Sequence, residues 1–293
     1  MNTLERFLDY VTYDTQSDPT VETVPTTAKQ KVLGQRLVND LKEIGLQDAY
    51  MDEHGYVYAS LKGNTEGKKA VGFVAHMDTS PDYSGYNVKP VILNNYDGKD
   101  IVVNGEVVTA VKDYPELAQY VGKTMVVTDG STLLGADDKA GVAIILSAME
   151  YLVNHPEVPH GDVHVGFTPD EEVGLGASLF DVKGFHCDFA YTVDGGAVDC
   201  IDYENFNAAH AVVTVQGNSI HPGSAKDKMV NAIHVAEEFD AMLPVQQRPE
   251  HTSGYEGFYH LMQFNGTVDG VTLEYLIRNH SREQFEQLKS FMM

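Results

Sequence analysis

Four short stretches of the sequence carry side chains that could do chemistry together: residues 76–78, residues 135–141, residues 170–172 and Asp194. Each stretch follows an apolar run or opens a periodic helix, and they supply one histidine and several carboxylates. In open α/β sheets, sites form beyond the carboxyl ends of the strands, so we expect these side chains to meet at one edge. A mixed set of imidazole and carboxylate ligands suits zinc, cobalt or manganese without selecting among them.

The reaction that these residues favour is hydrolysis assisted by two metal ions. A carboxylate such as Asp137 can bridge two ions, and ions roughly 3.5–4 Å apart can activate a water and polarise the scissile carbonyl. Of the adjacent Glu171 and Glu172, one can bind metal while the other moves a proton. Asp78 is placed to accept the second ring N–H of His76.

Each of these stretches has an ordinary structural reading when it is taken alone. A histidine after a strand is more often structural, a Glu-Glu pair is usually a solvated face, and an Asp at a helix start is usually a cap. The joint occurrence of all four stretches, in this order along the chain, favours a metal site.

The elements that would position these side chains alternate between strands and helices, which is typical of a mainly parallel α/β sheet. Residues 70–75 form a continuous apolar run, the pattern of a strand that is covered on both faces. Asn2 and Glu5 predict a capping box at the first helix. The predicted strands are 56–61, 70–75, 162–168 and 189–193, and the predicted helices are 2–11, 27–44 and 138–154.

Two further regions have their own patterns. Residues 81–128 hold short β-like pieces, including a predicted hairpin over 102–109 around an Asn-Gly turn, and this region reads as an insertion. From about residue 207 the order becomes β-α-β-β-α, a ferredoxin-like domain without its last strand. Its predicted elements are strand 208–216, helix 226–242, strands 258–264 and 271–277, and helix 282–291. We therefore expect two domains, 1–206 and 207–293, both incomplete.

Composition narrows the class of protein. The 293 residues are 43% hydrophobic and carry a net charge of −23, which disfavours nucleic acid as a partner. No run of eighteen apolar residues predicts a membrane span, and the first ten residues do not resemble a signal peptide. Cys187 and Cys200 form neither a CxxC pair nor a disulfide framework, so a cytoplasmic protein is expected.

Five motifs in order resemble the M20 family of metallopeptidases: HMDTSPD from residue 76, GADDKAGVA from 135, TPDEEVG from 168, TVDGG from 192 and GNSIHPGSAKDKMVNA from 217. Within the family, the chain looks most like enzymes that remove the N-terminal residue from tripeptides. The resemblance implies a zinc-exopeptidase-like α/β fold, with helices on both faces of a mainly parallel sheet and an inserted ferredoxin-like lid and dimerisation domain.

The resemblance also implies roles for the candidate residues. Two zinc ions per subunit would share Asp137, with His76 and Asp194 completing the ligands of one ion and Glu172 belonging to the other. Glu171 would be the general base. The family usually has a cis peptide after the bridging aspartate, here the bond between Asp137 and Asp138.

In the lid, the same resemblance places His221 near the substrate carbonyl, supplied by the partner subunit of a homodimer. Asn231 and Arg278 would help to hold a small peptide substrate. The forked guanidinium of arginine suits a peptide's terminal carboxylate because it can make two parallel hydrogen bonds.

The chain departs from the family pattern at its end. The family supplies a further histidine ligand near its C-terminus, whereas this sequence stops at Met293, and His251, His260 and His280 lie in the wrong context. We therefore expect the ion shared by Asp137 and Glu172 to lack a protein ligand. The alternatives are a truncated, inactive relative that binds one metal or only dimerises, an M20-type dipeptidase or N-acyl amino-acid deacylase, and a structural protein whose acidic clusters are only surface.

Overall fold

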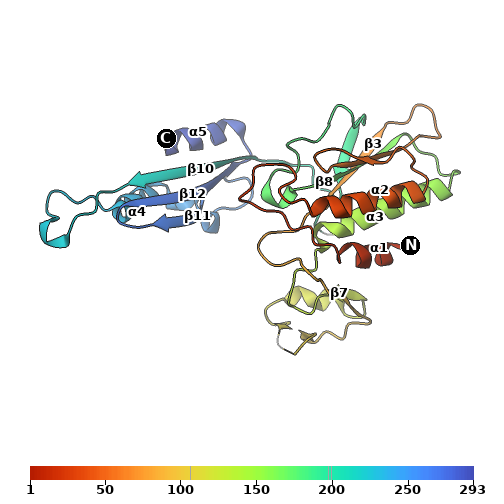
Figure 1. The fold of residues 1–293 in the computed structure, drawn as a ribbon, viewed down its shortest axis with the longest axis horizontal. Coiled ribbons are helices and arrows are strands. Elements are labelled where there is room, and N and C mark those ends of the chain that lie inside the picture. The colour runs from red at the N-terminus through yellow and green to blue at the C-terminus, as the bar shows by residue number, and fades with distance from the viewer. Residues whose placement is uncertain (106, 197, 199) are drawn as a thin grey trace. The chain divides into compact units, whose positions relative to one another are not determined.

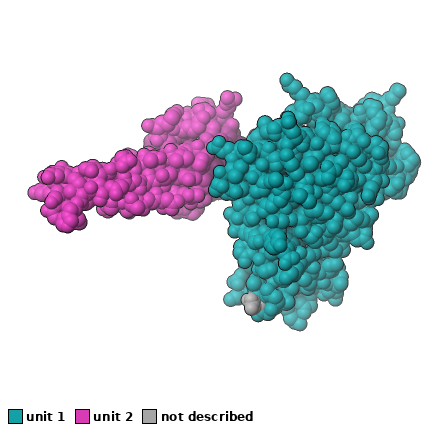
Figure 2. Space-filling view, viewed as in Figure 1, with its two compact units in different colours: residues 1–198 teal, residues 199–293 magenta. Residues whose placement is uncertain are grey.

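The chain forms two compact units, Met1–Val198 and Asp199–Met293, which are coloured separately in Figure 2. The computed structural model describes residues 1–105, 107–196, 198 and 200–293 (Figure 1). Each unit has its own hydrophobic core, so each is described by itself. Across the described residues, no helix combines the length and the apolar composition needed to cross a bilayer.

Unit 1 is built on a five-stranded mixed sheet with the order β1-β2-β8-β3-β9. Strands β8, β3 and β9 run parallel, as the apolar runs predict, whereas β1 and β2 pair antiparallel, and β2 also runs antiparallel to β8. A short turn joins β1 to β2, which only antiparallel neighbours permit. The strands are β1 Tyr50–Met51, β2 Val57–Leu61, β3 Val71–His76, β8 Val163–Thr168 and β9 Phe189–Thr192.

Three helices pack against one face of this sheet and form the main core with it. They are α1 Thr3–Tyr10, α2 Gln30–Glu43 and α3 Ala136–Asn154. Alternate residues of the strands point into this core, for example Val163, Val165 and Phe167 of β8, which are 3% exposed or less. The helices lie together beside β3 and β8 in Figure 1.

The opposite face of the sheet is covered differently from the expectation. Here Phe180 and Phe185, from the segment that follows β8, pack against Tyr56 and Tyr58. Within the described residues, therefore, helices cover one face only, where the sequence predicts helices on both.

Local signals account well for the helix ends. The capping box of Asn2 and Glu5 is present, which confirms that prediction. Helix α2 begins three residues later than predicted, and α4 (Ala232–Met242) begins six residues after the predicted start at 226. Helix α4 begins there because the Asn231 side chain accepts a hydrogen bond from the Ile233 N–H and caps the helix.

The insertion within unit 1 is a set of short strands with a small core of its own, around Tyr96, Ile101 and Leu117. Antiparallel pairing of β5 with β6 confirms the predicted hairpin, whose residue Glu106 lies outside the described residues. The elements are β4 Val91–Leu93, β5 Ile101–Val102, β6 Val108–Thr109, the 3-10 helix η1 Pro115–Tyr120, and β7 Met125–Val127, which pairs with β4.

Unit 2 has the predicted β-α-β-β-α order, with an antiparallel sheet in the order β10-β12-β11. One sheet face packs under the two helices, so alternate residues of β12 are buried. The elements are β10 Asn207–Gln216, α4, β11 Phe258–Gly266, β12 Gly270–Asn279 and α5 Arg282–Met292, with 3-10 turns η3 Pro222–Ser224, η4 Val245–Gln247 and η5 Pro249–His251.

Candidate metal centre

His76 is the last residue of the central strand β3, and its ring is buried. The ring Nδ1 donates to the main-chain carbonyl of Asp78 at 3.0 Å, and the Asp78 carboxylate lies 3.3 Å away. The other ring nitrogen, Nε2, faces the Asp137 carboxylate at 2.8 Å. The hydrogen bond from Nδ1 to Asp78 fixes the ring orientation and leaves Nε2 as the nitrogen that can bind a metal.

Two carboxylates meet His76 at this edge of the sheet. Asp137 comes from the start of α3, and Asp194 follows β9. One ligand atom from each of His76, Asp137 and Asp194 can be chosen so that all three lie within 4.8 Å of one another. The peptide bond between Asp137 and Asp138 is cis, as the resemblance predicts.

Asp138 holds the main chain near the candidate ligands in place, a role that the sequence did not reveal. Its buried carboxylate accepts hydrogen bonds from the main-chain N–H of His76 at 3.2 Å and of Gly141 at 3.1 Å. Burial, followed by the nearby Asp194 carboxylate, raises the pKa of Asp138 to about 8. The only signal of this role in the sequence is the pair of adjacent aspartates at the start of the helix, where a single aspartate would be enough to cap it.

Gly141 allows helix α3 to approach the end of β9. A Cβ at this position would lie 2.0 Å from the Val193 carbonyl oxygen and 2.3 Å from Asp138 Oδ1, far inside van der Waals contact. Any side chain here would push apart the backbone segments that carry Asp137 and Asp194. The glycine therefore sets the distance between two of the candidate ligands.

Glu171 and Glu172 lie in the 3-10 turn η2, Glu171–Val173, directly after β8. The fully buried Asp78 carboxylate accepts hydrogen bonds from both of their main-chain N–H groups, at 3.0 and 3.2 Å. The Glu171 carboxylate lies 3.9 Å from His76 Nε2. Asp78 thus connects the histidine ring to the glutamate pair.

The carboxylates of this cluster lie close enough together to favour the binding of a cation. Burial, followed by the Asp137 carboxylate, raises the pKa of Glu172 to about 7, and burial is also the main cause that raises the pKa values of Glu171 and Asp194. Burial alone would lower the pKa of His76, but the hydrogen bond and charge of Asp78 outweigh it and raise that pKa to about 10. A divalent ion would relieve this crowding of carboxylates, and the nitrogen and oxygen donors fit one.

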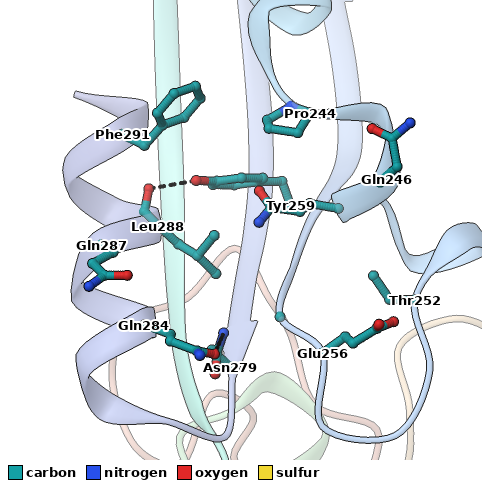
Figure 3. A pocket seen from close by; sticks show the side chains of 12 residues that line it. Pro244, Gln246, Thr252, Glu256, Tyr259, Asn279, Gln284, Gln287, Leu288 and Phe291 are labelled. Atoms are coloured by element: carbon teal, nitrogen blue, oxygen red, sulfur yellow. Dashed lines mark hydrogen bonds between the residues drawn. The ribbon is translucent and has the colours of Figure 1, made fainter.

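A cavity of about 390 Å³ adjoins the cluster, with His76, Glu171 and Asp194 on one wall and apolar side chains such as Val74 and Phe180 on another. A cavity of about 670 Å³ in unit 2 is larger (Figure 3), but its lining is mostly amide and apolar. Figure 3 shows its Tyr259 hydroxyl donating to the Leu288 carbonyl, at 2.8 Å. This larger cavity has no imidazole and a single carboxylate, so it lacks the means to hold a catalytic metal.

The three candidate residues of unit 2 each have a local structural role. His221 caps η3, where its Nδ1 accepts from the Gly223 N–H at 3.1 Å, and Asn231 caps α4. The Arg278 guanidinium stacks on the Phe206 ring, 4.4 Å from its centroid. None of these contacts by itself indicates substrate binding.

The structure does not bring His221 and Arg278 together within one chain. Arg278 pairs with Ala208 at one end of β10, and His221 lies beyond Gln216 at the other end. Eight residue steps along a strand span roughly 27 Å. One small ligand therefore cannot touch both side chains of the same chain.

Comparisons with known proteins agree with this architecture. A profile of the M20 peptidase dimerisation domain matches residues 203–292, and a profile of M42 glutamyl aminopeptidases matches residues 114–246. The chain is 56% identical to peptidase T of Clostridium acetobutylicum and 54% identical to that of Clostridium novyi, covering 99% of this chain and 72% of each relative.

Solved structures share the fold at lower identity. An aminopeptidase PepT from Bacillus cereus superposes with a TM-score of 0.69, and a tripeptidase from Staphylococcus aureus with a TM-score of 0.70. Both are 22% identical to this chain, and each comparison covers 99% of this chain and 69% of the other.

Proposed function

The chain belongs to the peptidase T family of M20 metallopeptidases, and from this premise we propose that it removes the N-terminal residue from tripeptides. The observation that carries the proposal is the cluster of His76, Asp137 and Asp194, with the Glu171 carboxylate 3.9 Å from the histidine nitrogen. This combination offers a place for metal and a base beside it.

The proposed cofactor is zinc, with two ions per subunit. His76, Asp137 and Asp194 would hold one ion, and Asp137 with Glu172 would hold the second. The Asp137 carboxylate contributes to the raised pKa of Glu172, which supports this second assignment. Bound ions would polarise the scissile carbonyl and lower the pKa of the attacking water.

Glu171 is the proposed general base. It would take a proton from the attacking water and deliver it to the leaving amine nitrogen. Its raised pKa supports this role, because proton transfer is most efficient when the pKa of the base lies near the working pH. Asp78 would act through other groups, by orienting the His76 ring and by holding the main chain of the glutamate pair.

The proposed roles of unit 2 require a second copy of the chain. Arg278 would bind the terminal carboxylate of the peptide, Asn231 would help to hold its backbone, and His221 would approach the scissile carbonyl. A tripeptide spans at most about 11 Å, so it cannot reach both ends of β10. A homodimer in which His221 comes from the partner satisfies this limit, and the match to a dimerisation domain supports it.

The test combines metal analysis with turnover of an unblocked tripeptide in added zinc. We expect two equivalents of zinc and turnover, and we expect Glu171→Gln to keep the metal while turnover falls roughly 10²–10⁴-fold. Glu43→Gln, at the exposed end of α2, is the matched control and should behave like the wild type.

A single zinc equivalent with no turnover would instead support a non-catalytic relative. Dipeptides and N-acyl amino acids in the same assay separate the two related hydrolase activities, since each predicts a different preferred substrate.

A further inference from the structure

A loop near the N-terminus runs alongside the site and is unusually rich in buried polar groups. We call residues 13–30, which comprise this loop and the first residue of helix α2, the strap. Loops normally lie on the surface with their polar groups in water. In the strap, four polar side chains are at most 8% exposed, namely Thr15, Ser17, Thr26 and Gln30. Buried polar groups need hydrogen-bond partners, and several partners of the strap lie in the site stretches or directly beside them.

The main contact of the strap is with Asp170, which directly precedes the glutamate pair. Asp170 Oδ2 accepts from the Thr26 N–H at 2.8 Å, and Oδ1 accepts from the Thr26 hydroxyl at 2.5 Å and from the Gln30 amide at 2.7 Å. In return, Gln30 Oε1 accepts from the main-chain N–H of Asp170 at 3.2 Å. Gln30 therefore holds both the side chain and the backbone of Asp170.

This contact fixes the direction in which the chain leaves β8. Asp170 is fully buried and adopts a left-handed backbone conformation with φ of 56°. Non-glycine residues hold such a conformation when their surroundings determine it. Moving Glu171 and Glu172 would require a buried carboxylate to lose its donors, which is unfavourable.

The strap also contacts the segment around Asp78, the second residue that holds the main chain of Glu171 and Glu172. Thr79 follows Asp78, whose carboxylate binds the main chain of both glutamates. The Thr79 N–H donates to the Thr15 carbonyl at 3.3 Å, and the Ser17 N–H donates to the Thr79 carbonyl at 3.2 Å. A third contact joins the strap to the start of α3, where the buried Lys139 amine donates to the Tyr13 carbonyl at 2.7 Å.

We propose that Thr26 and Gln30 are positioning residues that set the placement of Glu171 and Glu172 by acting through Asp170. The value of that placement for hydrolysis rests on the function proposed above. The placement itself is a property of the folded chain and can be measured without metal or substrate.

The test exchanges the partners of this contact in the full chain. Gln30→Glu removes the amide donor and places a second buried carboxylate beside Asp170. Asp170→Asn replaces one acceptor oxygen by an NH₂ group, which then faces a donor of Thr26 or Gln30. The double variant restores a donor facing an acceptor. Hydrogen exchange of the Glu171 and Glu172 amides, followed by NMR in metal-free protein, reports the geometry of the turn directly.

We expect each single variant to speed exchange of these two amides at least about tenfold and the double variant to recover most of the protection. The Val165 amide in β8 should keep its protection throughout. Gln35→Glu, an exposed glutamine of the same helix, is the control and should change none of these amides. If the single variants are unstable, Thr26→Val removes one hydroxyl donor and should produce a smaller loss in the same two amides.

The proposal is overturned if the single variants leave the two amides protected, if the double variant is no better than the single variants, or if Val165 loses protection in parallel, which would show general destabilisation. A wild-type chain that does not hydrolyse tripeptides would refute the proposed function and leave this result intact. Titration with Zn²⁺ alone should then show weaker binding in the single variants and recovery in the double variant.

Discussion

The two units bury very different side chains. Unit 1 encloses polar and charged groups around its site, among them His76, Asp78, Asp138, Lys139 and Asp170, whereas among the described residues Asn279 is the only buried polar residue of unit 2. Burying such groups costs free energy unless each finds partners. Unit 1 supplies these partners from segments far apart in the chain, as a site with fixed geometry requires.

Unit 2 follows the simpler plan of an apolar core between a sheet and two helices. Its candidate functional residues lie at helix caps and strand ends and take no part in that core. In unit 1 the buried polar groups that hold the fold also hold the candidate site, so we expect a loss of stability confined to unit 2 to leave metal binding unchanged.

A core substitution in unit 2 gives the largest expected effect on this comparison. Leu273 of β12 is fully buried, and Leu273→Ala should lower the free energy of unfolding of unit 2 by about 2–5 kcal/mol. Zinc affinity should remain unchanged. Denaturation followed by circular dichroism, with a parallel zinc titration, measures both quantities.

Leu276→Ala is the matched control, because Leu276 lies on the same strand but on the opposite, less buried face. Its loss of stability should be clearly smaller. If zinc binding weakened in step with the unfolding of unit 2, the prediction that the two units respond independently would be wrong.

A pair of glycine substitutions gives the next largest effect. Gly141→Ala should weaken zinc binding about 10–100-fold, the range seen when supports of metal ligands are removed, because the added methyl group collides with the Val193 carbonyl. Gly270→Ala in unit 2 places its methyl at an ordinary 3.7 Å from the nearest atom and should leave zinc binding intact. Equal effects from the two substitutions would contradict a specific role for Gly141.

A change of one pH unit gives the smallest expected effect on zinc affinity. The pKa of His76 lies near 10, so below pH 10 an ion must displace its proton, and affinity should fall up to about tenfold per pH unit. Below pH 7, Glu172 is also protonated, and the fall should steepen. Calorimetric zinc titrations at pH 6, 7 and 8 check this, and a constant affinity across that range would refute it.

Much of the fold and part of the site could be predicted from the sequence. Strand ends are visible as apolar runs, so the meeting of His76 with Asp137 and Asp194 could be anticipated. The antiparallel pairing of β1 with β2 is not visible in the sequence, because a two-residue strand has too little pattern to be recognised. The late start of α4 was missed because Asn231 reads equally well as a cap or as a residue inside the helix.

The contacts that hold the site from outside could not be predicted. Gln30 and Asp170 are 140 residues apart, and no pattern around Gln30 links it to the motif that contains Asp170. Threonine and glutamine in a loop normally indicate solvent exposure. Only the folded backbone shows that the strap turns these side chains inward.

Gly141 has a consequence for how substitution can change the spacing of the candidate ligands. The gap that it sets between α3 and β9 is already as narrow as an amino acid allows, because no residue is smaller than glycine. Substitution at this position can only widen the opening between the ligands.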